Sequence, residues 1–258
     1  MLSRLFGNRQ APERAVPTYR LPDGIRVYAI GDVHGRDDLL AALHEKISSD
    51  VAARPVERAV LVHLGDYVDR GPRVRETIAR LLDGPPEGVD EAHALLGNHE
   101  ETLLQFLEDP AAVYGNWAAY GGLATLMSYG VGRPGPAVDE KALWALRDEF
   151  AQKLSPAHLD FLRSLPRWKQ VGDFYFVHAG VRPGVSLGEQ TDYDLVWIRD
   201  AFLQSRKDFG ARVVHGHSIA FDPEVHPNRI AVDTGAYATG RLTAAVIEGS
   251  EVNFLATA

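Results

Sequence analysis

The chain has 258 residues, of which 45% are hydrophobic and 24% charged, and this fits one large globular domain with a substantial core. Its formal net charge of −8 argues against stable binding to nucleic acid or to an anionic membrane. The sequence contains no cysteine, which excludes disulfides, zinc–thiolate sites and a thiol nucleophile. Any metal ion must therefore bind His, Asp, Glu or Asn side chains.

Residues 1–24 are predicted to form an N-terminal arm. They lack the uninterrupted apolar stretch of a signal peptide, and Pro12, Glu13 and Pro17 argue against a long targeting helix. No apolar run elsewhere approaches the roughly 20 residues that a membrane-spanning helix needs. We therefore expect a cytoplasmic protein with no membrane partner, in which residues 25–258 form one domain.

The chain then repeats a pattern in which a short apolar run ends in a polar cluster that contains glycine. Such runs are typical of buried strands. Helices are predicted between the early runs, at residues 37–51 and, after Pro72, at residues 74–82. The apolar runs are residues 27–30, 59–64, 92–96, 174–177, 212–214 and 230–232. This alternation predicts an α/β fold in which the six polar clusters meet at one edge of the sheet structure.

The segment at about residues 101–165 has a different pattern and is predicted to be mostly helical. Gly and Pro residues near 130–136 interrupt it. Its predicted helices are residues 102–107, 123–128, 141–153 and 156–164. Because the segment lies between two of the predicted strands, we interpret it as a helical insertion beside the cleft rather than as a separate domain.

The polar clusters contain residues that could bind metal ions. Asp32 and His34 follow the first run, and alternate residues of an extended chain point the same way, so both could bind one ion. Asp66 follows the second run, and its carboxylate could bridge two ions. The later runs are followed by Asn98, His99, His178, His215 and His217. Any one cluster could be ordinary turn or core chemistry, but together they predict a dinuclear site of the kind that suits Mn, Fe or Zn.

Three motifs resemble the signature of the phosphoprotein phosphatase family, within the calcineurin-like metallophosphoesterases. They are Gly-Asp-Val-His-Gly at 31–35, Gly-Asp-Tyr-Val-Asp-Arg-Gly at 65–71 and Gly-Asn-His-Glu at 97–100. His-Ala-Gly at 178–180 and Gly-His-Ser at 216–218 resemble the later motifs of the family. The resemblance covers residues 25–250 and implies a β-sandwich flanked by helices.

The resemblance also implies two divalent ions, for which we expect Mn, with Fe, Zn, Ni or Mg as alternatives. Asp66 would bridge the two ions. The residues alone leave His215 and His217 as alternatives, and the family pattern selects His217. The implied metal ligands are Asp32, His34, Asp66, Asn98, His178 and His217.

The mechanism implied by the resemblance is direct attack of a metal-bridging hydroxide on phosphorus, without a phosphoenzyme. His99 matches the general acid that protonates the leaving oxygen. Asp69 would hold the imidazole of His99 and raise its pKa, as an opposite charge does. Both are therefore the predicted catalytic residues besides the metal ligands.

Four further residues are predicted to bind substrate. Arg70 matches a phosphate-binding arginine and Arg199 resembles a second one, since a guanidinium can bind two phosphate oxygens at once. A surface ion pair is the alternative for Arg199. Arg36 is a candidate for a lesser phosphate contact, with a plain surface charge as the alternative, and Tyr237 is a candidate to close the cleft.

The resemblance leaves more than one substrate class. Asp69 and Glu100 favour a bacterial-type Ser/Thr protein phosphatase that hydrolyses phosphoserine and phosphothreonine monoesters in a protein or peptide. The alternative is a hydrolase of dinucleoside polyphosphates such as diadenosine tetraphosphate. Members of that sister group often lack the Asp found here at position 69 and often have Asp in place of Glu100. A catalytically inactive binding module is disfavoured, because no expected functional residue is missing. Aromatic residues of the insertion that could stack on a nucleotide base are Trp117, Tyr120, Tyr129 and Trp144.

Overall fold

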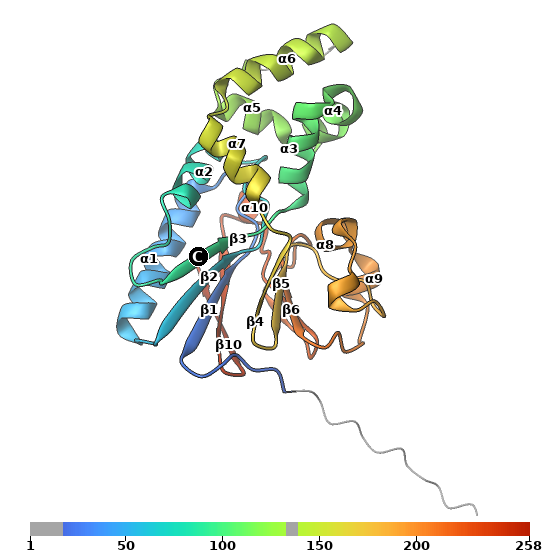
Figure 1. Ribbon diagram of the computed structural model, residues 1–258. Coiled ribbons are helices and arrows are strands. Elements are labelled where there is room, and N and C mark those ends of the chain that lie inside the picture. The colour runs from blue at the N-terminus through green and yellow to red at the C-terminus, as the bar shows by residue number, and fades with distance from the viewer. Residues whose placement is uncertain (1–17, 133–138) are drawn as a thin grey trace, which may run out of the picture.

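The computed structural model describes residues 18–132 and 139–258, so most of the predicted N-terminal arm lies outside the described residues. Ten strands in the described part form two five-stranded sheets (Figure 1). In sheet order, the first consists of β10 (Glu251–Ala256), β9 (Thr243–Glu248), β1 (Ile25–Ile30), β2 (Arg58–His63) and β3 (Glu91–Ala94). The second consists of β4 (Trp168–Val171), β5 (Phe174–Val177), β6 (Arg212–His215), β8 (Arg229–Ala231) and β7 (Glu224–Val225).

Both sheets are mixed, and each contains three neighbouring parallel strands. In the first sheet β1, β2 and β3 are parallel, with Val27 opposite Val60 and Leu61 opposite Ala92. In the second sheet β5, β6 and β8 are parallel. The six predicted polar clusters follow these six strands. Because parallel strands end at the same edge of a sheet, the fold brings all six clusters to the carboxyl ends of the strands.

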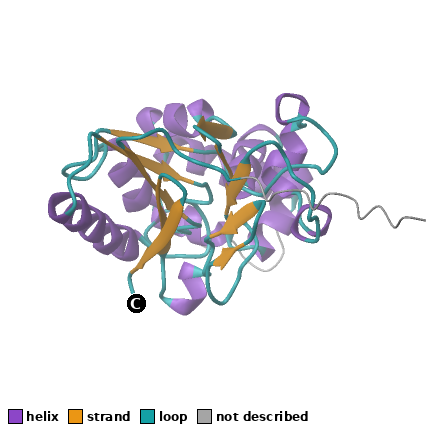
Figure 2. Cartoon of the chain, turned by 90° about the horizontal axis from the view of Figure 1, so that it is seen from below, coloured by secondary structure: helices purple, strands orange, loops and turns teal. Residues whose placement is uncertain are grey.

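The main core lies between the two sheets. Val27 and Ala29 of β1 and Phe174 and Phe176 of β5 belong to one buried apolar cluster. Alternate residues of the same strands, such as Tyr28 and Tyr175, face the helices on the outer sides. Since successive side chains of a strand point to opposite faces, this alternation makes a sandwich with helices on both outer surfaces (Figure 2). The predicted fold class is confirmed.

Helices cover the outer faces and the upper edge of the sandwich (Figure 1). α1 (Asp37–Ala53) and α2 (Val74–Leu82) contribute buried residues to the apolar cluster on the outer face of the first sheet. α8 (Asp192–Trp197) and α9 (Asp200–Leu203) pack on the second sheet, and α10 (Ala236–Thr239) follows β8. A short 3₁₀ turn, η1 (Leu187–Glu189), precedes α8.

Five helices connect β3 to β4 and lie above the strand ends in Figure 1. They are α3 (Asn98–Glu108), α4 (Pro110–Ala119), α5 (Gly122–Ser128), α6 (Glu140–Lys153) and α7 (Pro156–Ser164). α3 begins at Asn98 rather than at residue 102, because Glu100 accepts a hydrogen bond from the Gly97 backbone N–H and so caps the first turn (3.0 Å). Two of the predicted site residues therefore lie in the first turn of α3.

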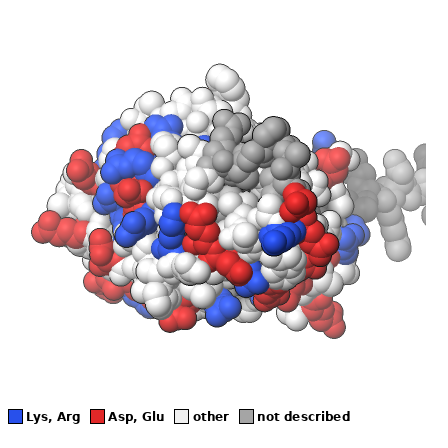
Figure 3. Space-filling view, turned by 90° about the horizontal axis from the view of Figure 1, so that it is seen from above, with Lys and Arg blue, Asp and Glu red and all other residues white. Residues whose placement is uncertain are grey.

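The surface carries charges of both signs. On the face drawn in Figure 3, Lys and Arg side chains are interspersed with Asp and Glu side chains. Among the described residues, no helix is both long and apolar enough to cross a bilayer.

Candidate metal centre and adjoining pocket

The loops after the strands hold several predicted site residues in an unusual backbone conformation. Among the described residues, the non-glycine residues with positive φ all belong to the predicted site, with φ between 47° and 69°. This left-handed region is sparsely populated by non-glycine residues, and such strain concentrates at functional sites. These residues are His34, Asp66, Asp69, Arg70 and His217.

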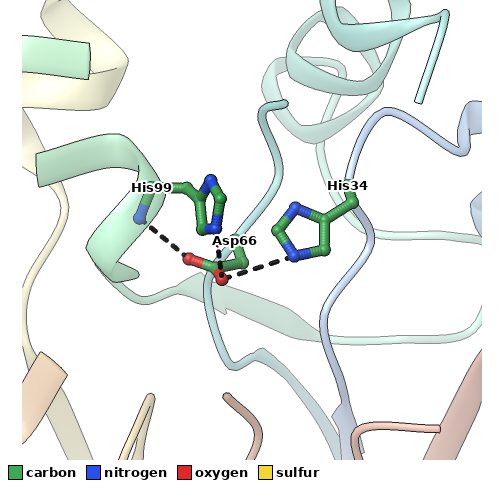
Figure 4. Close-up of side chains that lie close together, drawn as sticks. All are labelled: His34, Asp66 and His99. Carbon is green, nitrogen blue, oxygen red and sulfur yellow. Dashed lines mark hydrogen bonds and ion pairs between the residues drawn. The ribbon is translucent and has the colours of Figure 1, made fainter. Parts of the chain in front are cut away.

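Asp66 lies at the centre of the cluster, and its two carboxylate oxygens face different histidines. Oδ2 lies 3.5 Å from His34 Nε2 and 3.9 Å from His99 Nε2. Figure 4 shows the two imidazole rings on either side of this carboxylate. Oδ1 lies 3.4 Å from His178 Nε2. The side chains form two groups that could each hold a metal ion, one with His34 and His99 and one with His178 and His217, and Asp66 belongs to both. This is the arrangement that a bridging carboxylate requires.

Two histidines have their ring orientation fixed by the backbone. His34 Nδ1 lies 2.8 Å from the carbonyl oxygen of Val68, and His178 Nδ1 lies 3.0 Å from that of Leu64. Each Nδ1–H donates to its carbonyl, which leaves the Nε2 lone pair facing the cluster. Hydrogen bonds of this kind commonly orient histidines that bind metals.

The remaining predicted ligands complete the cluster. Asn98 Oδ1 lies 2.9 Å from His178 Nε2, which also lies 3.2 Å from His217 Nδ1. Asp32 accepts a hydrogen bond from the backbone N–H of His217 at 3.1 Å. Asp32 also forms a buried carboxyl pair with Asp233, a residue that we did not predict for the site.

The chemistry of these side chains fits bound cations. Buried Nε2 atoms of His34 and His217 have no hydrogen-bond partner among the described residues. Burial lowers the pKa of His34 to about 3, and burial and the neighbouring His178 lower the pKa of His217 to about 2, so both rings are neutral as metal ligands must be. Burial beside Asp233 and Asp66 raises the pKa of Asp32 well above its usual value, which shows excess negative charge in the site.

His99 differs from the other histidines of the site. Burial alone would lower its pKa, but the carboxylates of Asp66 and Asp69 raise the pKa of His99 above its usual value. Its Nδ1 lies 2.6 Å from Asp69 Oδ2, and its Nε2 lies 3.1 Å from the guanidinium of Arg70. The ring that Asp69 holds can, when it is protonated, give its Nε2 proton to a leaving oxygen.

The predicted substrate-binding residues differ in their position relative to the pocket. Arg70 and Arg199 both line the pocket next to the cluster, and Arg199 donates to the carbonyl oxygen of His217 at 3.2 Å. The Arg70 guanidinium lies 4.5 Å from the ring centroid of Tyr237, whose ring lies 5.5 Å from that of His34. Arg36 instead forms an ion pair with Asp38 (2.6 Å) and does not line the pocket.

The pocket has a volume of about 370 Å³ and extends from the cluster to the inner faces of α3 and α4. At the cluster its walls are Asp32, Asp66, Asn98, His99 and His217. Farther out they are Thr102, Gln105, Ala112, Val113, Asn116, Trp117, Tyr120 and Trp197. Of the four aromatic residues that we considered for base stacking, Tyr120 lies on this wall and is exposed, whereas Trp117 is 1% exposed and offers almost no ring surface to a ligand.

Two further features were not apparent from the sequence. The Glu100 carboxylate is fully buried and accepts hydrogen bonds from the backbone N–H groups of Asp66, Tyr67 and Val68, at 2.7 to 3.0 Å. It therefore shapes the loop that carries Asp66. His215 packs against Phe202, with ring centroids 5.0 Å apart, so it does not share the position of His217 beside His178.

A helix-flanked β-sandwich with a histidine–carboxylate cluster at its strand ends defines a metal-dependent phosphoester hydrolase. The family model of the calcineurin-like phosphoesterases matches residues 25–239, and the chain belongs to this family.

Similar proteins differ in their names and in how much of the chain they match. An Arabidopsis thaliana serine/threonine-protein phosphatase, BSL2, is 39% identical over 77 residues, but these are 30% of this chain and 8% of that protein. The asymmetrical bis(5'-nucleosyl)-tetraphosphatase PrpE of Bacillus subtilis is 28% identical over 83% of this chain and 87% of its own length. The crystal structure of a putative diadenosine tetraphosphatase matches 90% of this chain and 93% of that chain, with a TM-score of 0.59 at 21% identity, and so supports the fold.

Proposed function

We propose that the protein hydrolyses dinucleoside polyphosphates, and that it does so with two divalent ions bound at the histidine–carboxylate cluster. The pocket beside the cluster carries this proposal. Tyr120 and Trp197 provide aromatic surface there, and Gln105 and Asn116 provide side-chain amides. An open pocket with aromatic side chains and a few polar groups suits a nucleoside, because a base stacks on aromatic rings and forms hydrogen bonds with amides.

The relatives support the same choice. PrpE, which matches most of the chain, is named a bis(5'-nucleosyl)-tetraphosphatase, whereas the match to the plant protein phosphatase covers less than a third of the chain. Asp69 and Glu100, which favoured a protein phosphatase in the sequence, do not line the pocket. Asp69 contacts the proposed general acid and Glu100 contacts the loop of Asp66, so neither residue reports on the leaving group.

The proposed roles follow from position. The ligands would be Asp32, His34, Asp66, Asn98, His178 and His217, and the bound ions would activate water and offset the charge of the phosphate oxygens. Arg70 and Arg199 line the same pocket and would bind phosphate oxygens of the substrate. His99 would give its Nε2 proton to the departing oxygen, and Asp69 would hold its ring.

The proposal is tested by comparing two substrates side by side. With Mn present, we expect turnover of diadenosine tetraphosphate to exceed phosphate release from a phosphoserine peptide by more than about tenfold in kcat/KM. Ion-exchange analysis of the nucleotide products shows which phosphate bridge is cleaved. Dominant peptide turnover would refute the proposal and support the protein phosphatase alternative. A His99→Asn variant controls for a contaminating hydrolase.

A further inference from the structure

Asp69 is held by two residues of the helical insertion as well as by its contact with His99. Its side chain is fully buried, and its carboxylate accepts hydrogen bonds from Trp117 Nε1 at 3.0 Å and from Thr125 Oγ1 at 2.5 Å. The Thr125 hydroxyl also accepts a hydrogen bond from the Asp69 backbone N–H at 2.9 Å. With His99 as the third partner, the carboxylate has a donor on every side and cannot rotate freely.

The two donors are themselves firmly placed. Trp117 of α4 is 1% exposed, and its ring lies 4.4 Å from that of Phe106 of α3, centroid to centroid. Its other side contacts Gly122 of α5 so closely that a Cβ there would lie 2.3 Å from the indole. Thr125, also of α5, is fully buried. Neither α4 nor α5 belongs to the sandwich that supplies the candidate metal ligands.

The loop of Asp69 touches the insertion at a second point. The backbone N–H of Arg70 donates to the carbonyl oxygen of Gly121 at 3.1 Å, just before α5. The insertion therefore contacts both the carboxylate that orients His99 and the arginine that faces it. This makes α4 and α5 part of the support of the proton donor, in addition to a wall of the pocket.

We propose that Trp117 and Thr125 are positioning residues, which fix the ring of His99 through Asp69 for proton donation to the leaving oxygen. As a water oxygen forms a new bond to phosphorus and releases a proton to solvent, the P–O bond to the leaving group breaks and its electron pair stays on the leaving oxygen. The His99 Nε2 proton joins that oxygen to give the neutral alcohol. The inference holds for any phosphoester whose leaving group is an alkoxide, so it does not depend on the nucleotide substrate proposed above. It does depend on His99 as the donor, and this dependence is tested by its own variant.

The test compares leaving groups that do and do not need a proton. A p-nitrophenolate ion leaves unprotonated, whereas the alkoxide of glycerol 2-phosphate requires a proton in the transition state. Thr125→Val keeps the shape of the side chain and Trp117→Phe keeps an aromatic ring, and both lose the donor. For both variants we expect kcat on glycerol 2-phosphate to fall by about tenfold or more. Turnover of p-nitrophenyl phosphate should change by less than about twofold, and KM should stay the same for both substrates.

Three further variants make the result decisive. Thr125→Ser keeps the hydroxyl and should restore the alkyl phosphatase activity. Trp144→Phe makes the same aromatic change on α6, outside the pocket and away from Asp69, and should leave both activities unchanged. His99→Asn should show the largest selective loss on glycerol 2-phosphate. If this variant lost activity on both substrates equally, His99 would not be the proton donor, and the inference would be refuted as well.

A second readout needs neither metal nor substrate. In the ¹⁵N NMR spectrum of the metal-free protein, the His99 Nδ1–H signal should broaden or shift in Thr125→Val and return in Thr125→Ser. Equal losses on both leaving groups in Thr125→Val and Trp117→Phe, or no loss at all, would overturn the inference. The same samples assayed on diadenosine tetraphosphate separate the two proposals, because failure to cleave it refutes the proposed function and leaves the leaving-group result standing.

Discussion

Replacing Glu100 with Gln should destabilise the fold strongly, although the two side chains have the same shape. Oε1 accepts from the backbone N–H groups of Tyr67 and Val68, and Oε2 accepts from those of Asp66 and Gly97. Either orientation of the amide therefore turns an NH₂ group toward two buried N–H donors. Each donor left without an acceptor costs about 1–3 kcal/mol, so the free energy of unfolding should fall by about 4 kcal/mol.

Urea unfolding followed by circular dichroism measures this loss. Burial and the nearby Asp66 raise the pKa of Glu100 to about 8, so the comparison is best made at pH 9, where the wild-type side chain is a carboxylate. Glu108→Gln makes the same change at an exposed position of α3 and should alter stability by less than about 0.5 kcal/mol. A loss below about 1 kcal/mol in Glu100→Gln would refute the argument that this carboxylate holds the Asp66 loop.

Three other predictions follow from the structure. Burial lowers the pKa of His44 to about 4 and that of its partner His63 to about 3, so the unfolded chain binds more protons below pH 6.5. These two rings should therefore make the protein about 5 kcal/mol more stable at pH 6.5 than at pH 4, and His44→Leu should remove about half of this rise in urea titrations. Mn at a hundred times its Kd should stabilise the wild-type protein by about 2.7 kcal/mol and so raise its melting temperature, and the rise should be much smaller in Asp66→Asn. Equal rises in melting temperature, measured by calorimetry, would contradict the assignment of Asp66 as a metal ligand. Tyr120→Ala should raise KM for diadenosine tetraphosphate by about tenfold and leave p-nitrophenyl phosphate turnover unchanged, whereas equal changes would argue against base stacking.

Local sequence signals predicted the elements that carry the site. The helix predicted at residues 74–82 is α2, and the helix predicted at residues 37–51 is α1 with two more residues. The apolar runs matched the six parallel strands; in five of these strands both faces are largely buried, whereas β3 is a partly exposed edge strand. Since the polar clusters follow these strands directly, their convergence followed from the fold alone.

Long-range contacts could not be read from the sequence in the same way. Helix α4 was not among the predicted helices, because Gly115 interrupts it and its short sequence has no clear apolar stripe. Its Trp117 was considered for base stacking, but it is buried and donates to Asp69, 48 residues earlier in the chain. Asp233 belongs to the last of the six polar clusters that were predicted to meet, but its side chain was not assigned to the site, and its pairing with Asp32 is seen only in the folded structure. Such contacts depend on how the insertion and the two sheets pack, which no local pattern encodes.

Anomalous diffraction from crystals grown with Mn tests the central claim most directly. The account predicts two Mn peaks per chain that share the Asp66 carboxylate, with His34 at one peak and His178 and His217 at the other. One peak only, or peaks that do not contact Asp66, would contradict the assignment of this cluster as a dinuclear metal centre.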